Sequence, residues 1–268
     1  MKVSGIITLT TDFGLNDPYV GIMKGVILSI NRKAKVVDIT HRVKAGAILQ
    51  AASLIQEAYP YFPEGTVHVG VIDPGVGSDR RLILVSIKSH LFVGPDNGIF
   101  WPIIESHNDA RVIELTQSQY FLEKISYTFH GRDIFAPVAA HLSKGLDPFK
   151  MGAPINDPVK LHWPTARVKK GKLVGQVVRI DAFGNLITNI HEKEIKEFLG
   201  DAVPLIRAGD LSIEGIRRTY AEAEMGEFLA MIGSSGFMEL AVNMGHASQR
   251  LGLDSDEIIG LEVEIGKI

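Results

Sequence analysis

The 268-residue chain contains no cysteine, which excludes a disulfide framework, a thiolate nucleophile and a cysteine-ligated zinc site. It also lacks an excess of either charge, because 28 Lys and Arg residues face 31 Asp and Glu residues. This balance gives no electrostatic footprint for nucleic acid. No apolar run approaches the roughly 20 residues of a membrane span, and the start MKVSGIITLTTDFG is not a signal peptide. We therefore expect a globular, cytoplasmic protein without nucleic-acid or membrane partners.

The first half of the chain alternates short apolar runs with segments of helical spacing. Strands are expected at 5–10, 35–39 and 66–72, a hairpin-like pair at 82–87 and 90–94, and helices at 19–30, 45–59 and 131–142. Asp17 is in position to cap the first of these helices. Strands that alternate with helices predict an α/β domain over 1–150 with a largely parallel central sheet.

The second half has a different composition and a different pattern. The stretch 151–170 is rich in proline and basic residues, and we interpret it as a linker. Short strand-like runs then follow at close spacing, at 173–180, 186–190, 203–207, 227–233, 237–242 and 259–265, with one short helix near 245–252. This pattern favours a smaller, β-barrel-like domain over 171–268.

Polar side chains follow the expected strands of the first half. The carboxylates and the amide at these strand ends are Asp12, Asp17, Asp73, Asp96 and Asn97. In open α/β sheets, ligands bind beyond the carboxyl ends of the strands. Each of these residues also has a structural interpretation, because tight turns require Asp, Asn, Pro and Gly. Several carboxylates buried together need a cationic partner, which is either Arg80 or a bound ligand.

Two strings of the second half are candidates for ligand binding. Asp181 and Asn185 flank Phe183 and Gly184 between two apolar runs. An Asn side chain can pair with an adenine edge and an aromatic ring can cover the base, but a hairpin turn with a positive φ at Gly184 fits equally well. The string GSSG at 233–236 is either a turn, which we favour, or a clamp for a carboxylate. The residues alone therefore indicate a two-domain α/β protein with an acidic site that suits a nucleoside.

Six strings in the same order resemble the S-adenosylmethionine (SAM) hydroxide adenosyltransferases, or SAM hydrolases, a family related to the fluorinases and chlorinases. They are T-L-T-T-D-F-G-x-x-D-P-Y-V-G-x-M-K-G at 8–25, V-D-I-T-H at 37–41, V-I-D-P-G-V-G at 71–77, V-G-P-D-N-G at 93–98, F-H-G-R-D-x-F-A-P at 129–137 and D-x-F-G-N-x-x-T-N at 181–189. The resemblance implies an N-terminal α/β domain, a C-terminal β-barrel-like domain and a homotrimer with active sites between subunits.

The resemblance also implies roles for individual residues in substrate binding. Asp12 is expected to hold both ribose hydroxyls, and Asn185 to read adenine. Asp17 is expected to contact the methionine amino group, with Asp181 in the same pocket and Ser234 at the methionine carboxylate.

Phe129 and Gly131 complete the substrate-binding set, and Asp73, Arg80 and His130 are the catalytic candidates. Halogenases of this kind carry Tyr where Asp73 stands, and a carboxylate there repels a halide and accepts a hydrogen bond from water. The resemblance therefore implies attack of water or hydroxide at the ribose C5′ atom, which releases L-methionine and adenosine. SAM is then the substrate, and the scheme needs neither cofactor nor metal. Whether Asp73 or His130 takes the proton is left open.

Two rival functions remain at this stage. The first is a metal-dependent nucleoside or phosphate-ester hydrolase, because Mg²⁺ and Ca²⁺ prefer oxygen ligands. Its ligands would be Asp12, Asp17, Asp73, Asp96 and Asn97. The second is a SAM- or adenosine-binding protein without turnover.

Overall fold

The computed structural model describes residues 2–268, and the side chains of all of these except residues 255 and 256. The chain divides into two compact units between His162 and Trp163, within the stretch 151–170 that we interpreted as a linker. Among the described residues, no helix combines the length and the apolar character needed to cross a bilayer.

The first unit is built on a seven-stranded sheet with helices on both faces. Its strands are β1 (Ile6–Thr11), β2 (Lys35–Thr40), β3 (Val67–Val71), β4 (Leu82–Ser86), β5 (Leu91–Pro95), β6 (Arg111–Leu115) and β7 (Gly152–Ile155). Its α-helices are α1 (Tyr19–Ile30), α2 (Ile48–Ala58), α3 (Trp101–Ser106) and α4 (Ala136–Ser143), and a π-helical turn, Gly131–Phe135, precedes α4.

The sheet is mixed, with the strand order β2-β1-β3-β5-β4-β6-β7. Strands β2, β1, β3 and β5 are parallel, whereas β4, β6 and β7 extend the sheet with antiparallel pairs. The prediction of a largely parallel sheet is therefore too strong. The connection between β4 and β5 is too short for a crossover, so these strands form an antiparallel hairpin. The carboxyl ends of β1, β3 and β5 meet at one edge, as the sequence predicted.

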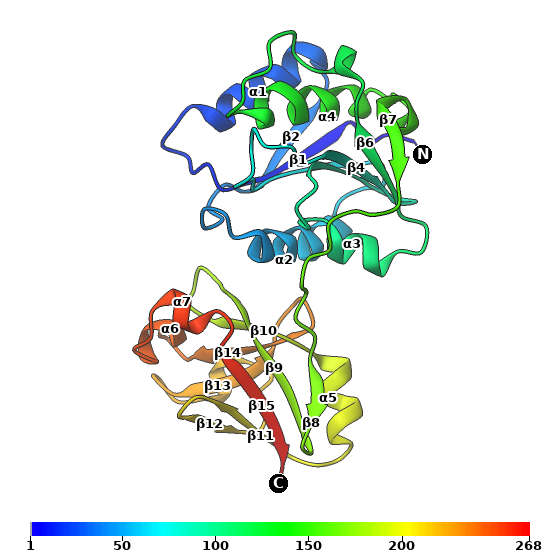
Figure 1. Ribbon diagram of the computed structural model, residues 1–268. Coiled ribbons are helices and arrows are strands. Elements are labelled where there is room, and N and C mark those ends of the chain that lie inside the picture. The colour runs from blue at the N-terminus through cyan, green and yellow to red at the C-terminus, as the bar shows by residue number, and fades with distance from the viewer. Residues whose placement is uncertain (1) are drawn as a thin grey trace. The chain divides into compact units, whose positions relative to one another are not determined.

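Helices α1 and α4 cover one face of this sheet, and α2 and α3 cover the other (Figure 1). Helix α1 buries Val20, Met23 and Ile27, whose spacing of three and four residues forms one helical face. Strand β1 buries Ile7 and Leu9 against the same cluster, as its alternating side chains require. Helix α1 has the bounds expected from the sequence, but its N-cap is Pro18 and no side chain caps it, so the predicted Asp17 cap is wrong.

The second unit is an eight-stranded antiparallel sheet with the path β12-β11-β15-β9-β10-β14-β13 and β8 paired to β9. Its strands are β8 (Arg167–Lys169), β9 (Lys172–Ile180), β10 (Leu186–His191), β11 (Pro204–Ala208), β12 (Leu211–Glu214), β13 (Phe228–Ile232), β14 (Phe237–Val242) and β15 (Glu262–Lys267). Its helices are α5 (Glu192–Leu199), α6 (Ala247–Arg250) and α7 (Ser255–Ile258).

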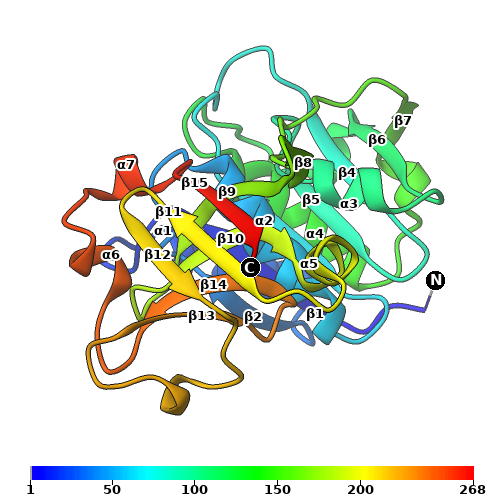
Figure 2. The same cartoon turned by 90° about the horizontal axis from the view of Figure 1, so that it is seen from below.

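This sheet curls until its two ends approach each other. The end strands β12 and β13 are in contact (Figure 2). The backbone N–H of Arg217, just after β12, donates to the carbonyl of Ala230 in β13 at 2.8 Å. The unit is therefore a nearly closed barrel, in agreement with the expectation from its short, closely spaced strands.

Candidate active site

A cavity of about 370 Å³ opens at the edge of the first sheet where β1 and β3 end. Five residues singled out from the sequence are among those that line it: Asp12, Asp73, Phe129, His130 and Gly131. Asp12 directly follows β1, Asp73 follows β3 by two residues, and the other three begin the turn that leads into α4. The parallel arrangement of β1 and β3 thus brings together Asp12 and Asp73, which are 61 residues apart in the sequence.

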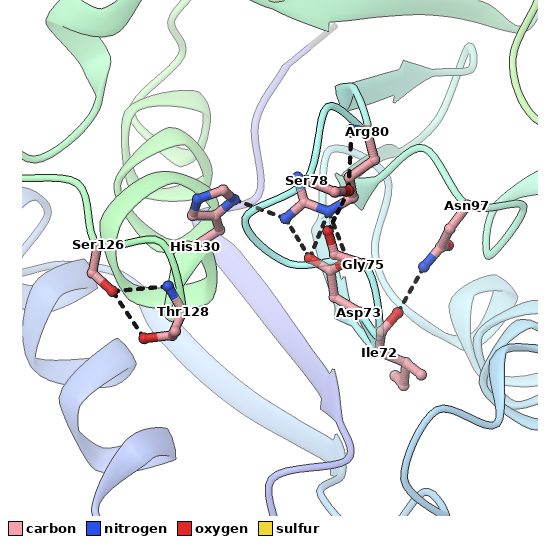
Figure 3. A network of polar contacts seen from close by, with 9 residues as sticks. All are labelled: Ile72, Asp73, Gly75, Ser78, Arg80, Asn97, Ser126, Thr128 and His130. Carbon is pink, nitrogen blue, oxygen red and sulfur yellow. Dashed lines mark hydrogen bonds and ion pairs between the residues drawn. The ribbon is translucent and has the colours of Figure 1, made fainter.

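Asp73, Arg80 and His130 form one connected network (Figure 3). Arg80 Nε donates to both carboxylate oxygens of Asp73, at 2.7 and 2.9 Å, and Arg80 Nη2 pairs with Asp73 Oδ2. Arg80 Nη2 also donates to His130 Nδ1 at 2.7 Å. The side chains of Asp73 and Arg80 are only 5% and 9% exposed, so this ion pair lies in a poorly solvated environment.

The network fixes the protonation of His130. Burial lowers the pKa of this imidazole, and the positive charge of Arg80 lowers it further. A guanidinium has donors only, so Nδ1 must be the acceptor and the proton of the neutral ring lies on Nε2. On the other side of the ring, the proton on Nε2 meets the backbone of Ser126, and this hydrogen bond partly offsets the lowering of the pKa.

The loop from Asp73 to Arg80 is closed by its own turns. The N–H of Val76 donates to the carbonyl of Asp73 at 3.2 Å, and the hydroxyl of Ser78 donates to the carbonyl of Gly75 at 2.7 Å. Gly77 has a φ of +80°, and a Cβ there would lie 2.4 Å from the carbonyl oxygen of Tyr127. Only glycine therefore lets this loop pack against the segment that precedes His130.

The segment around His130 is held from the opposite side by Asp133, which is fully buried. Its carboxylate pairs with Arg132 at 2.5 Å and accepts the N–H of Ser126 at 2.8 Å. A Cβ on Gly131 would lie 3.3 Å from Met23 Sδ, so glycine allows this π-helical turn to approach α1. Such turns occur frequently at functional sites.

Asp12 and Asp17 lie in different environments. Asp12 Oδ2 accepts the N–H of Gly46 at 3.0 Å, and both residues line the cavity. Asp17 is exposed and has no polar partner within the described part of the chain. The rings of Phe13 and Tyr19, which follow these two aspartates in the sequence, contact that of Phe129 edge to face, with centroids 5.8 and 5.3 Å away.

The second unit carries a separate cavity of about 460 Å³, lined in part by Phe183, Asn185 and Tyr220. The amide nitrogen of Asn185 donates to Asp181 Oδ2 at 2.9 Å and to the Tyr220 hydroxyl at 3.0 Å. Asp181 Oδ1 accepts the N–H groups of Phe183 and Asn185, and Gly184 has a φ of +83°. Asp181 therefore closes the hairpin turn between β9 and β10, and Asn185 keeps its Oδ1 acceptor for a ligand.

Ser234 and Ser235 lie in the turn between β13 and β14. The N–H of Gly233 donates to the carbonyl of Phe237 at 2.9 Å, and the N–H of Gly236 donates back to Gly233 at 3.0 Å. The turn interpretation of this string is confirmed, and the role of Ser234 in binding a carboxylate stays a prediction.

Family models match both units of the chain. The N-terminal domain of the SAM hydroxide adenosyltransferases matches residues 7–152, and the C-terminal domain of the same family matches residues 175–259. The chain belongs to the SAM hydroxide adenosyltransferase family.

Named relatives of this family member cover nearly its whole length. It is 41% identical over 266 residues to the (R)-S-adenosyl-L-methionine hydrolase of Methanocaldococcus jannaschii, with 94% of each chain covered. It is 36% identical to the hydrolase of the same name from Thermus thermophilus, with 91% of this chain and 94% of the relative covered. A fluorinase of Nocardia brasiliensis is more distant, at 27% identity and 97% coverage of both chains.

A solved structure shares this architecture. The crystal structure of an uncharacterized conserved protein from Thermotoga maritima matches with a TM-score of 0.89 and 36% identity, covering 98% of this chain and 100% of that one. The family resemblance seen in the six sequence strings is thus confirmed.

Asp96 and Asn97 have structural partners in this SAM hydroxide adenosyltransferase. Asp96 pairs with Arg81 at 2.7 Å and accepts the N–H of Val159 at 2.9 Å. The amide of Asn97 donates to the carbonyl of Ile72 at 2.8 Å. Among the described side chains, those of residues 2–254 and 257–268, no three Asp, Glu or His residues converge as a metal site would require. The geometry therefore does not favour the divalent-cation alternative.

The role of Arg81 was missed in the sequence. It connects Asp96 to Asp157, which lies 76 residues after Arg81 in the sequence. Arg81 Nη1 donates to Asp157 Oδ1 at 2.8 Å. The adjacent basic pair at 80 and 81 was visible, but no local pattern shows which aspartate each arginine meets.

Proposed function

We propose that this chain hydrolyses S-adenosyl-L-methionine to adenosine and L-methionine. Its relatives at 34–41% identity are named (R)-S-adenosyl-L-methionine hydrolases. The observation that supports the reaction most directly is the carboxylate of Asp73 at the cavity wall, bound to Arg80, which in turn contacts His130.

The reaction is an in-line displacement at the ribose C5′ atom. A water oxygen forms the new C5′–O bond while the C5′–S bond breaks, and the electron pair of that bond leaves with sulfur as the thioether of methionine. The sulfonium is already a good leaving group and needs no acid. The protein therefore has to orient the water, exclude bulk solvent and receive one proton.

Asp73 is the better of the two candidate proton acceptors. The Nδ1 lone pair of His130 is occupied by Arg80, and its Nε2 carries a proton, so neither ring nitrogen accepts from water in this arrangement. Asp73 Oδ1 receives one N–H from Arg80 and keeps a second acceptor direction. His130 then acts by orienting Arg80.

Arg80 supplies the positive charge next to the reacting oxygen. Its Nη1 donates to no protein acceptor among the described residues and is not enclosed by them. A donor aimed at a developing hydroxide stabilises it more than neutral water, which favours ionisation of the nucleophile.

Substrate contacts follow the family pattern in this proposal. Asp12 holds the ribose hydroxyls with the carboxylate oxygen that Gly46 leaves open, and Phe129 and Gly131 shape the same cavity. Asn185 offers Oδ1 to the adenine amino group. The methionine contacts of Asp17, Asp181 and Ser234 rest on the family resemblance.

The test is turnover of SAM by chelator-treated protein in chloride-free buffer, with products separated by chromatography. Equimolar adenosine and methionine are expected, and the yield should not change when Mg²⁺ or chloride is added. Intact SAM would overturn the hydrolase proposal, and a chlorinated nucleoside after chloride addition would move the chain to halide transfer. Loss of activity with chelator would restore the metal-dependent alternative.

We also propose the homotrimer that the family resemblance implies. Light scattering should then give three times the chain mass of 29.3 kDa. A fully active monomer would contradict it. The cytoplasmic location expected from the sequence stays a prediction.

A further inference from the structure

The string V-D-I-T-H at 37–41 has no role in the proposed reaction, yet it ends beside the loop that carries Asp12. The pairing of β1 with β2 shifts by one residue at this point, because Leu9 is opposite Asp38 whereas Thr10 is opposite Thr40. The shift places His41 next to the end of β1. His41 is 3% exposed, so its contacts are made in the protein interior.

His41 holds the chain on both sides of Asp12. Its Nδ1 lies 2.8 Å from the hydroxyl oxygen of Thr11, and that oxygen accepts the N–H of Phe13 at 3.3 Å. The carbonyl of His41 accepts the N–H of Gly14 at 2.8 Å. Every residue from 11 to 14 except Asp12 itself is therefore tied to His41, directly or through Thr11.

The opposite side of the imidazole faces a carboxylate. His41 Nε2 lies 3.1 Å from Asp38 Oδ1, close enough for an ion-pair contact although not aligned as a hydrogen bond. Asp38 Oδ2 accepts from Lys24 of α1 at 2.6 Å. Because a carboxylate faces Nε2, the ring proton belongs there, and Nδ1 of the neutral ring is left to accept from the Thr11 hydroxyl.

Asp38, His41 and Thr11 thus have the order of a carboxylate–imidazole–hydroxyl triad, but they do not form a nucleophile. Thr11 is fully buried, and its hydroxyl is already shared between His41 and the N–H of Phe13. Thr11 is also absent from the residues that line the cavity. These three residues can therefore act only by fixing the position of neighbouring residues.

We propose that Asp38 and His41 are positioning residues that, through Thr11, aim the carboxylate of Asp12 at the ribose hydroxyls. The same segment supplies the other support of Asp12, because Gly46, five residues after His41, donates its N–H to Asp12 Oδ2. One loop therefore fixes the backbone on both sides of Asp12 and one of its two carboxylate oxygens. This inference rests on the proposed role of Asp12 in ribose binding.

The test is the preference of the full chain for adenosine over 2′-deoxyadenosine, measured as the ratio of their dissociation constants by calorimetry. We expect a ratio of about ten or more in the unmodified protein, as one charge-assisted hydrogen bond provides. His41→Leu should bring the ratio close to one and raise the dissociation constant of adenosine about tenfold. His41→Asn, which keeps a polar atom near the Nδ1 position, should restore most of the preference.

His68→Leu is the matched control. His68 is also buried, and its Nδ1 also lies 2.8 Å from a β1 threonine, Thr8, but neither residue lines the cavity. This variant should lose stability like His41→Leu and keep the adenosine preference. All binding is measured below the onset of thermal unfolding of each variant. If His41→Leu does not fold, Asp38→Ala takes its place as the test, because Asp38 lies at a partly exposed site. This variant should reduce the preference for adenosine severalfold.

Asp12→Ala distinguishes the proposed ribose role of Asp12 from the positioning role of Asp38 and His41. If Asp12→Ala keeps the preference for adenosine, the proposed ribose role of Asp12 is wrong. If Asp12→Ala abolishes the preference but His41→Leu and Asp38→Ala both keep it, the positioning role is overturned. A loss of preference in His68→Leu equal to that in His41→Leu would also overturn it, because the effect would then be general loosening.

Discussion

Arg80 and Arg81 are neighbours in the chain, and each pairs with a nearly buried aspartate at the carboxyl end of a sheet strand. Arg80 binds Asp73 beyond β3, whereas Arg81 binds Asp96 beyond β5. Asp73 and Asp96 are 5% and 1% exposed as side chains, so the charge and the burial of the carboxylates do not distinguish the two pairs.

The pairs differ in what else each guanidinium contacts. Arg81 uses all its nitrogens on protein acceptors, namely Asp96, Asp157 and the carbonyl of Asp157. It therefore fastens the segment near residue 157 to the sheet, and a protein acceptor already holds each of its nitrogens. Among the described residues, the guanidinium of Arg80 bonds only to Asp73 and the neutral His130, and its Nη1 remains available. The Arg80 pair is the one whose carboxylate, Asp73, lines the cavity and whose guanidinium keeps an unsaturated donor.

The largest expected effect is on turnover in a pair of isosteric variants. Asp73→Asn should lower kcat for SAM by about a thousandfold, because the proposed proton acceptor is lost. Asp96→Asn keeps an acceptor for the N–H of Val159 and is expected to change kcat by less than about threefold, since Asp96 lies outside the cavity. Single-turnover measurements on both variants provide the comparison. Equal losses would show that the two pairs are not functionally distinct.

The next effect is a loss of stability, and we expect it when the pair of Arg81 and Asp96 is broken. Arg81→Gln leaves the carboxylate of Asp96 nearly buried without a cation, and we expect a loss of about 2–3 kcal/mol in the free energy of unfolding. The side chain of Arg81 is 26% exposed, which limits the cost. Chemical denaturation gives the loss, and the kcat of the folded variant should stay close to that of the parent protein. A variant that is as stable as the parent would contradict the fastening role.

The strand ends were predictable from the sequence for a physical reason. An apolar run followed by Asp, Pro and Gly indicates where a buried strand stops, so the positions of Asp12 and Asp73 followed directly. The partners of the arginines did not follow, because Arg80 and Arg81 occupy consecutive positions and their side chains leave in different directions. Only the fold decides that one meets His130 and the other meets Asp157.

Some elements were missed although a signal was present. Helix α5 begins with a capping box, in which Glu194 accepts the N–H of His191 and the side chain of His191 accepts the N–H of Lys193. The sequence HEKE carries this pattern, but short strand-like runs on both sides concealed it. Strand β7 lies inside the proline-containing stretch 151–170, where composition alone favours a linker. Its pairing with β6 is a long-range contact that no local pattern reveals.

The smallest effect concerns the ionisation of His130, which reports the influence of the Arg80 charge on this imidazole. Burial and, after it, Arg80 lower the pKa of His130 below the usual value of about 6.5. The imidazole should therefore remain neutral as the pH falls through 6.5, and kcat/KM should stay constant over that range. The loss of activity in acid should begin at a lower pH. Over the same interval the unfolded chain takes up a proton that the folded chain refuses, so this histidine lowers stability as the pH falls.

Arg80→Gln should raise the pKa of His130, because a cation that lowers it is lost while the carboxylates of Asp73 and Asp133, which raise it, stay. Arg81→Gln should leave that pKa unchanged, since Arg81 is not among the groups that shift it. Titration of the His130 ring resonances by NMR gives the pKa of this residue in both variants, even where turnover is lost. A rise of equal size in both would mean that long-range charge, rather than the Nη2 contact, sets the state of the imidazole. The division between a reactive and a fastening arginine would then lose its electrostatic basis.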